Sequence, residues 1–397
     1  MIPSVRASYN AAFSEEKYQQ LIDTIHRDWP DQLEFRIAES PVFIPVSLRE
    51  KLTTACESFI DTIAAPDFKS KTDAAIPPHQ RVPNENAHTH FLAIDFAICQ
   101  NEAGEYDPQL IELQGFPSLF AFQGYLPELF KSQFPIPESF IWNFGNYSLE
   151  EYKQKLKEVI LADEEPAHCI LLEIFPEKQK TRVDFAVTEA FLGIRSVCYT
   201  QIKKEGRTLY YDLDGVKTPI KRIYNRLIFD DLTSYPDLQA EFSFMDDLDV
   251  TWVGHPNWFF RISKYTLPLL QSPYVPETHY LSEYQGNFPE NLEAYVLKPL
   301  FSFAGTGVNL YPTRELLAEI TDPENYILQK KVSYQPVIQA PDGLVKCEIR
   351  MLYVWPDHAT RPELLTSLSR LSRGEMIGVR FNKDFTWVGG TACFFES

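Results

Sequence analysis

The sequence predicts an α+β protein built from several packed units. A chain of 397 residues has room for about two or three such units, and a hydrophobic content of 44% is ordinary for a globular protein. Helical periodicity followed by a strand hairpin marks the first third of the chain. A strand–helix–strand pattern marks the middle, and long strand-like runs close the chain, so helices and both kinds of sheet are expected.

In the first third we expect two helices and one hairpin. Residues 14–29 repeat apolar side chains at helical spacing. A second helix is predicted from Ser47, with Glu50 three residues later as a capping box. Residues 91–99 and 110–114 have the composition of strands and are joined by a short polar connector, which predicts a hairpin.

The middle of the chain predicts a parallel sheet. Ser148 and Glu151 form a capping box at the start of a helix. A strand over 170–175, a helix over 181–192 and a strand over 194–199 follow with short links. Strand–helix–strand units with short links place their strands parallel to each other.

The last part of the chain predicts a different unit. Asp214-Gly215 indicates a tight hairpin turn that helps to complete the middle unit. A short helix carrying Lys264 then precedes a strand and a glycine loop, described below. A helix over 313–320, a strand over 326–332 and long strands from 343 to the end complete the chain.

Composition limits the classes of partner. The net charge is −18, from 37 basic and 55 acidic residues, and such a field repels nucleic acids and anionic membranes. No apolar run approaches the about 20 residues that span a bilayer, and no signal peptide is recognisable at the start. The six scattered cysteines indicate reduced, buried thiols, so we expect a cytoplasmic protein.

The segment 295–308 is the most informative part of the sequence. An apolar strand delivers Lys298 and opens into a loop with Gly305 and Gly307. An ammonium beside free backbone N–H groups suits a polyphosphate. The lysine precedes the glycines, so the spacing is not that of a Walker A loop. A plain alternative is a strand that ends in a glycine turn and carries a surface lysine.

A candidate metal site lies on the predicted hairpin. Glu112 and Gln114 are two residues apart in one strand and therefore share a face, together with Leu110. Asp95 lies in the neighbouring apolar strand, where a carboxylate is costly to bury unless it is paired or bound to a cation. Three oxygen donors suit Mg²⁺. The alternative is a set of ordinary polar residues on a half-exposed hairpin.

Two further groups of residues point to phosphate chemistry. Lys264 and Lys298 come from separate elements, and the strand edge near Gln329 and Lys330 offers backbone groups to an adenine ring. Near the C-terminus, Glu348 and Arg350 share one face of a predicted strand. Further polar residues and glycines follow downstream: Arg370, Arg373, Asn382 and the pair Gly389-Gly390. Arginines with a planar fork of donors are what a phosphoryl group requires. A solvated sheet face is the alternative for Lys330 and Arg373.

In this order the motifs resemble the ATP-grasp superfamily in a circularly permuted arrangement. The later part of the chain follows the family's usual order of motifs: Lys264, Lys298-Pro299 with its loop, Gln329, Glu348-Ile-Arg350, Arg370, Asn382 and Gly389-Gly390. The metal motif that normally closes the family stands at the front instead, as Ile94-Asp95 and Glu112-Leu-Gln114-Gly-Phe-Pro117-Ser118-Leu119. This permutation is similar to that of glutathionylspermidine synthase and its relatives, and it covers the chain from about residue 85 onward.

The resemblance implies a fold of two α/β subdomains that hold ATP between antiparallel sheets, with an inserted Rossmann-like pre-ATP-grasp unit. The implied segments are 1–147 with the N-terminal helices and metal-binding part, 148–255 with the inserted unit, and 256–397 with the lysine and glycine-loop subdomain and the remaining sheet. The implied reaction is ATP- and Mg²⁺-dependent joining of a small-molecule carboxylate to an amine, or a thiol, through an acyl phosphate. The oligomeric state is not implied.

The resemblance also assigns roles to residues. Those implied to bind ATP are Lys264, Lys298, Ser302, Gly305, Thr306, Gly307, Gln329 and Lys330. Those implied to hold Mg²⁺ are Asp95, Glu112 and Gln114, and those implied to act in the transfer are Arg350, Arg370 and Asn382. Asn225-Arg226 is expected either to meet the acceptor carboxylate or to lie at a strand end without a ligand.

Two departures from the family favour other functions. Gln114 replaces the usual metal-binding Asn, and Ala93 stands where glutathionylspermidine synthase has an arginine. They favour a nucleotide-binding regulatory module without catalysis. A phosphotransferase of the same fold, which stops after phosphorylation, is a third hypothesis.

Overall fold

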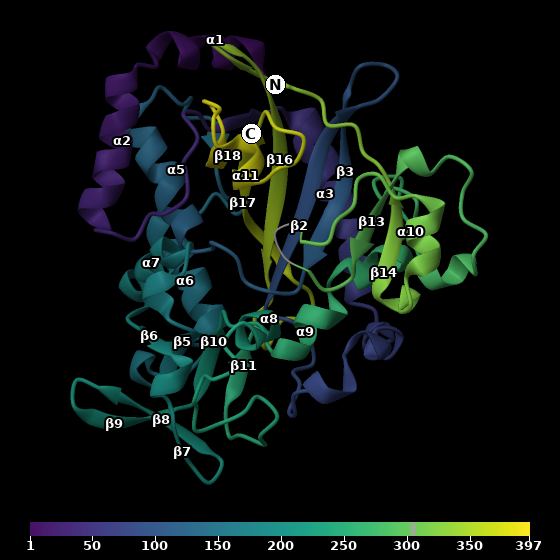
Figure 1. Ribbon diagram of the computed structural model, residues 1–397. Helices are drawn as coiled ribbons and strands as arrows, with labels where there is room; N and C mark the ends of the chain where they lie inside the picture. Colours follow the sequence, from purple (N-terminus) through teal and green to yellow (C-terminus); the bar gives the residue numbers. More distant parts are fainter. Residues whose placement is uncertain (303–305) are drawn as a thin grey trace.

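The structure is a computed structural model that describes residues 1–302 and 306–397. Within these ranges four β-sheets form, and helices pack around them (Figure 1). The largest sheet lies in the centre, a parallel sheet lies below it in the view, and a small antiparallel sheet lies beside β3.

The central sheet combines strands from both ends of the chain in the order β1-β18-β17-β16-β2-β3, with β15 and β4 added at β16 and β18. Its strands are β1 (Val42–Ile44), β2 (Phe91–Gln100), β3 (Tyr106–Gln114), β4 (Phe140–Ile141), β15 (Ile338–Ala340), β16 (Gly343–Val354), β17 (Glu363–Ser372) and β18 (Gly389–Glu396). The predicted hairpin β2–β3 is confirmed, and β2 also pairs antiparallel with β16. The front hairpin is therefore held beside the C-terminal strands.

Helices from the first third cover this sheet: α1 (Pro3–Ala12), α2 (Glu15–Asp28), α3 (Val46–Ile63), α4 (Phe68–Lys71) and α5 (Phe122–Gln133). On one face, the rings of Phe59 in α3 and Phe96 in β2 stack at 5.9 Å. Because neighbouring residues of a strand point to opposite faces, Asp95 points away from α3. The candidate site lies on that second face.

The helix predicted over 14–29 is confirmed as α2, but the capping box predicted at Ser47 is wrong. The helix α3 begins one residue earlier, at Val46, and its N-cap is Pro45. The Pro45 carbonyl accepts the first bonds, from the backbone N–H groups of Leu48 and Arg49 at 3.1 and 3.0 Å. Ser47 therefore lies inside the first turn, where its hydroxyl cannot cap the helix.

The middle unit contains the predicted parallel sheet, in the order β11-β10-β5-β6. Its elements are α6 (Leu149–Ile160), β5 (Cys169–Glu173), α7 (Arg182–Leu192), β6 (Arg195–Cys198), β7 (Lys203–Glu205), β8 (Thr208–Leu213), β9 (Val216–Ile220), β10 (Arg222–Asn225), α8 (Phe229–Thr233) and β11 (Thr251–Val253). The capping box of Ser148 and Glu151 forms as predicted. Asp214 and Gly215, at φ of 53° and 84°, make the predicted turn between β8 and β9.

The last unit is a small sheet in the order β12-β14-β13, with α10 (Arg314–Glu319) beside it. Its strands are β12 (Thr278–Tyr280), β13 (Tyr295–Pro299) and β14 (Tyr326–Lys330), and it is preceded by α9 (Pro256–Arg261) and the 3₁₀ helix η6 (Lys264–Leu269). A separate apolar cluster fills it: Leu281, Leu292, Tyr295, Leu297, Leu317 and Leu328. In contrast, the core of the central sheet continues into the middle unit through residues such as Tyr152 and Tyr224.

All six cysteines are free and buried, as expected. Among the described residues, no helix combines the length and apolar character needed to cross a membrane. The parallel sheet lies inside the predicted segment 148–255, while the segment boundaries themselves stay predictions.

Candidate functional site

A bulge in the front hairpin shapes the site. In the β2–β3 register Asp95 pairs with Glu112, but the next residue, Phe96, pairs with Leu110, so Ile111 is extra. Glu112 therefore faces the same side as Asp95, and Gln114, which pairs with Ala93, does so too. The prediction that Leu110 shares this face is wrong, because the extra residue inverts the alternation and buries Leu110 in the core.

The bulge carbonyl holds the first of the two predicted lysines. Lys298 reaches across from β13, and its Nζ donates to the carbonyl of Ile111 at 3.1 Å and to Oε1 of Gln329 at 2.6 Å. The Gln329 amide in turn donates to the Thr278 hydroxyl at 3.0 Å, which fixes its orientation. Lys298 thus connects the small sheet to the central sheet.

The second lysine makes a parallel connection. Nζ of Lys264, at the start of η6, lies 2.7 Å from Oε1 of Glu112 and donates to the carbonyl of Ser302 at 2.9 Å. The front hairpin and the two distant lysines therefore lie together, as the sequence predicts.

Two arginines surround the buried carboxylate of Asp95. Arg350, its direct neighbour on β16, donates from Nε to Oδ1 at 2.5 Å and from Nη2 to Oδ2 at 2.6 Å. Arg370 on β17 donates from Nη2 to Oδ2 at 2.9 Å and also pairs with Glu348. Asp95 is only 1% exposed, so these partners supply what its burial requires.

Two hydroxyl groups complete this ionic network. Arg350 donates from Nη1 to the Ser118 hydroxyl at 2.9 Å, and the Tyr334 hydroxyl donates to Oε2 of Glu348 at 3.1 Å. The sequence analysis missed both residues as partners. Ser118 lies within the quoted front motif, which was a usable signal, but Tyr334 lies in a connector whose pattern indicates no contact.

The site is electropositive inside an acidic protein. Four cations, Lys264, Lys298, Arg350 and Arg370, meet three carboxylates, Asp95, Glu112 and Glu348, so one positive charge is in excess among these seven groups. Asp230 in α8 also lies near enough to Lys264 for the ammonium to oppose the rise that burial causes in its pKa. Burial lowers the pKa of the Lys298 ammonium to about 8. Burial acts to raise the pKa of Glu112, but Lys264, with Lys298 and Arg350, holds it below its usual value. Burial raises the pKa of Glu348, and the nearby Asp95 adds to this effect while Arg370 opposes it.

The residues present fit an anion such as a polyphosphate. Nε of Arg370 is buried and has no hydrogen-bond partner among the described residues, and the same holds for the hydroxyl of Ser302. Buried polar groups without partners are rare in native proteins, and a bound group satisfies them. Lys264 and Lys298 lie close by with three donors each.

The predicted magnesium ligands fit less well. Both oxygens of Asp95 already accept from arginines, so a divalent ion there would meet two guanidinium charges. Among the described residues, no group of three His, Cys, Asp or Glu side chains is arranged to hold a metal ion. Glu112, with 23% of its side chain exposed, is the most accessible of the predicted carboxylates.

The predicted nucleotide loop is only partly described. Gly305 lies outside the described residues, and Thr306 is exposed. Gly307 has a φ of +72°, and a Cβ there would lie 2.7 Å from Cγ of Pro299, so this position requires glycine.

The predicted strand edge at Gln329 and Lys330 is wrong. Their strand, β14, is the middle strand of its sheet and pairs with β12 and β13. The backbone N–H of Lys330 donates to the Glu277 carbonyl at 2.8 Å. The next backbone N–H, that of Lys331, donates to the Ala294 carbonyl at 2.7 Å, so neither group is free to bind an adenine ring.

Asn382 organises a loop and is not free to hold a ligand. Its Oδ1 accepts from the Ser372 hydroxyl and from the backbone N–H groups of Arg373 and Gly374. Its Nδ2 donates to the carbonyls of Met376 and Gly378. Since both N–H donors are used, the geometry does not support the predicted transfer role. Arg373 pairs with Asp342 through Nη2, while its Nε is buried without a partner in the described part of the chain.

Asn225-Arg226, expected near an acceptor, lies buried at the end of β10. Nη1 of Arg226 donates to Asp184 in α7 at 2.8 Å, and the other oxygen of Asp184 accepts from the backbone N–H of Phe122 in α5. This pair ties the middle unit to the helix that follows the front hairpin. The Nε of Arg226 is buried without a partner in the described part of the chain.

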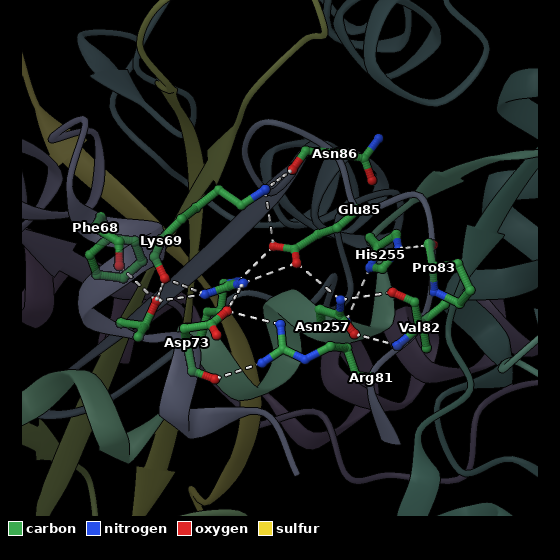
Figure 2. Close-up of polar contacts among 12 residues, drawn as sticks. Phe68, Lys69, Asp73, Arg81, Val82, Pro83, Glu85, Asn86, His255 and Asn257 are labelled. Carbon is green, nitrogen blue, oxygen red and sulfur yellow. Dashed lines mark hydrogen bonds and ion pairs between the residues drawn. The ribbon is translucent and has the colours of Figure 1, made fainter. Parts of the chain in front are cut away.

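A polar clamp holds the turn before Lys264. Arg261, the last residue of α9, donates to Glu85 at 2.6 and 3.0 Å, to Asp73 at 3.0 Å and to the Lys69 carbonyl at 2.5 Å. Figure 2 shows Lys69, Asp73 and Glu85 directed toward one another, with Asn257 and His255 near Val82 and Pro83. Because Lys264 follows three residues after Arg261, this clamp fixes where η6 begins.

Comparison with solved structures shows a likeness of fold. No family model matches the chain, and no curated protein matches it. Its fold is similar to the apo structure of a glutathione synthetase-like effector from Globodera pallida, with a TM-score of 0.60, 11% identity and 96% of each chain covered. At this identity the likeness shows a shared mixed α+β fold.

The clamp generates a prediction about stability. Arg261→Gln removes a guanidinium whose side chain is 3% exposed and takes from Glu85, at 12%, its two-bond partner, so we expect the free energy of unfolding to fall by about 3 kcal/mol. Arg207→Gln is the matched control, because Arg207 pairs with Asp247 and Asp249 while 53% of its side chain is exposed. The control is expected to lose less than about 1 kcal/mol. Urea unfolding at pH 7 measures both, and equal losses would contradict the clamp.

Proposed function

We propose that this protein is an ATP-dependent ligase with a circularly permuted ATP-grasp fold, which joins a carboxylate to an amine or a thiol through an acyl phosphate. The observation that carries the proposal is the 2.7 Å contact between Lys264 and Glu112. It brings the front hairpin and the later lysines into one charged cluster. The likeness of fold to a glutathione synthetase-like protein supports the same class of reaction.

In this proposal each charged group has a role in binding. Lys264 and Lys298 bind the phosphates of ATP, which supplies the phosphoryl group that activates the substrate carboxylate. Arg370, with its open Nε, and Arg350 beside it balance the charge of the transferring group. The loop that includes Thr306 and Gly307 covers the phosphates and excludes water, which protects an acyl phosphate from hydrolysis.

Mg²⁺ remains part of the proposal as the ion that accompanies the triphosphate. Of the three predicted ligands, Glu112 has the surroundings that suit the ion best, because its side chain is partly exposed. The proposed substrates are a small-molecule carboxylate and an amine, with a thiol as the less common nucleophile.

A nucleotide-binding module without catalysis is the second candidate. The specific observations that favour it are Gln114 and Ala93 on the site face, together with the pairing of Asp95 by arginines. A phosphotransferase that stops at the phosphorylated carboxylate is the third. The three candidates differ in whether ATP is consumed and in the product formed from the carboxylate, which is a condensed product for the ligase and an acyl phosphate for the phosphotransferase.

The test of the proposed function is the release of ADP from Mg²⁺-ATP in the presence of pooled amino acids and polyamines, with the product mass measured. We expect turnover that Glu112→Ala lowers at least about 100-fold, because it removes the carboxylate partner of Lys264 in the cluster. Glu105→Ala is the control, since this exposed glutamate of the same hairpin pairs with Lys51 outside the site.

A condensed product supports the ligase, and a phosphorylated carboxylate supports the phosphotransferase. Binding of ATP without turnover in any mixture supports the inactive module. Failure to bind ATP at all would contradict the whole proposal.

The low pKa of Lys298 predicts a pH dependence of binding. In the free protein its pKa is about 8, and a bound polyphosphate raises it because the ammonium is then paired. Affinity for ADP is therefore constant well below pH 8 and falls above it, by up to about tenfold per pH unit.

Calorimetric titration from pH 7 to 9.5 measures this dependence. The matched variant is Lys298→Arg, which stays charged and should remove the fall in affinity. An identical fall in both proteins would show that another group is responsible.

A further inference from the structure

We infer that Asp95 is a positioning residue that anchors Arg350 and Arg370, and that it is not a ligand of a metal ion. The inference deepens the proposed function and rests on it for the identity of the anion, the phosphates of ATP. It reverses the role that the resemblance implies for Asp95.

The first argument is the geometry of the pair. Asp95 and Arg350 are directly opposite each other on adjacent strands, and Nε and Nη2 of the arginine meet the two carboxylate oxygens at 2.5 and 2.6 Å. This side-on, two-pronged contact is the strongest arrangement of a guanidinium and a carboxylate. The strand register alone therefore holds the pair together.

The second argument is the remaining capacity of the carboxylate. Arg370 contributes a third bond, to Oδ2 at 2.9 Å. A carboxylate has about four lone-pair sites, and three of them are used here. A magnesium ion needs an approach of about 2.1 Å, on the side where two cations already lie within hydrogen-bond distance.

The arginines beside Asp95 are also held by other groups of the network. Nη1 of Arg350 bonds to Ser118, and Glu348 is shared by Arg370 and Tyr334. Within this network, Nε of Arg370 is buried and has no partner among the described residues. Asp95 thus fixes two guanidinium groups so that one of them offers a donor to an anion.

The test separates anchoring from metal binding by working without metal. Pyrophosphate is titrated into the full chain in EDTA by calorimetry, for wild type, Asp95→Asn, Arg350→Gln and the double variant. We expect each single variant to weaken binding by about tenfold. We expect the double variant to be no weaker than the weaker single variant, because Asp95 acts through Arg350. Asp107→Asn, on the same hairpin and bonded to Gln109, is the control and should bind as wild type does.

A metal ligand gives the opposite pattern. Removing a negative charge from a metal-free site leaves pyrophosphate binding unchanged or tighter, while the affinity for Mn²⁺ in the presence of ADP falls in Asp95→Asn. Anchoring predicts the same Mn²⁺ affinity in Asp95→Asn as in wild type, and a loss in Glu112→Gln. If the losses in pyrophosphate affinity of Asp95→Asn and Arg350→Gln add up in the double variant, the inference is also overturned, because independent structural effects are additive.

Thermal unfolding keeps the inference testable if the wild type binds no pyrophosphate or ADP, an outcome that would contradict the proposed function alone. The Tm of Asp95→Asn should fall strongly, since the buried Arg350 loses its carboxylate partner and Arg370 keeps only Glu348, and Arg350→Gln in that background should lower it little further. If Asp95→Asn does not fold, Arg370→Gln replaces it, because the Arg370 side chain is 37% exposed. In that variant Mn²⁺ affinity should be unchanged, and tighter Mn²⁺ binding would overturn the inference.

Discussion

The antiparallel pairing of β2 with β16 is the constraint on which the rest of this structure depends. It places Asp95 opposite Arg350 and sets a strand from the front of the chain beside the C-terminal strands. Because paired residues share a face, the register decides that the carboxylates of the hairpin and the arginines of the C-terminal strands meet on one side of the sheet. A shift by one residue would turn Asp95 into the core under α3.

The charged cluster is assembled from a sheet and from two lysines that reach it from other elements. A buried lysine without a carboxylate in direct contact is unfavourable, and the low pKa of Lys298 reflects this. Its hydrogen bonds go to the neutral oxygens of Ile111 and Gln329. Such a group gains free energy when an anion replaces or joins these partners. An excess of positive charge inside a protein of net charge −18 is thus a local feature that anion binding explains.

The sequence was sufficient for most elements and for the identity of the charged groups. The helix over 14–29, the capping box at Ser148 and the parallel unit follow from local patterns, and local patterns decide such elements. Lys264 and Glu112 were expected to meet because of a family resemblance, since no local rule connects residues so far apart. The expected loop carries the required glycine at Gly307.

The remaining features depend on contacts that no local pattern contains. The bulge at Ile111 is an insertion relative to the partner strand, so it is visible only once β2 and β3 are aligned. The middle position of β14 depends on β12, which lies about 50 residues earlier in the chain. Asp95 was correctly expected to need a partner. Without the β2–β16 register, however, the sequence does not show whether that partner is an arginine of β16 or a metal ion. For the same reason the clamp around Arg261 was missed.

The most direct measurement of the central claim is an experimental structure of the protein with a non-hydrolysable ATP analogue. The account predicts that the phosphates lie against Lys264 and Lys298, that the Lys298 ammonium exchanges the Ile111 carbonyl for a phosphate oxygen, and that Asp95 keeps both arginines. A nucleotide bound elsewhere, with the contacts of both lysines to the front hairpin unchanged, would contradict it.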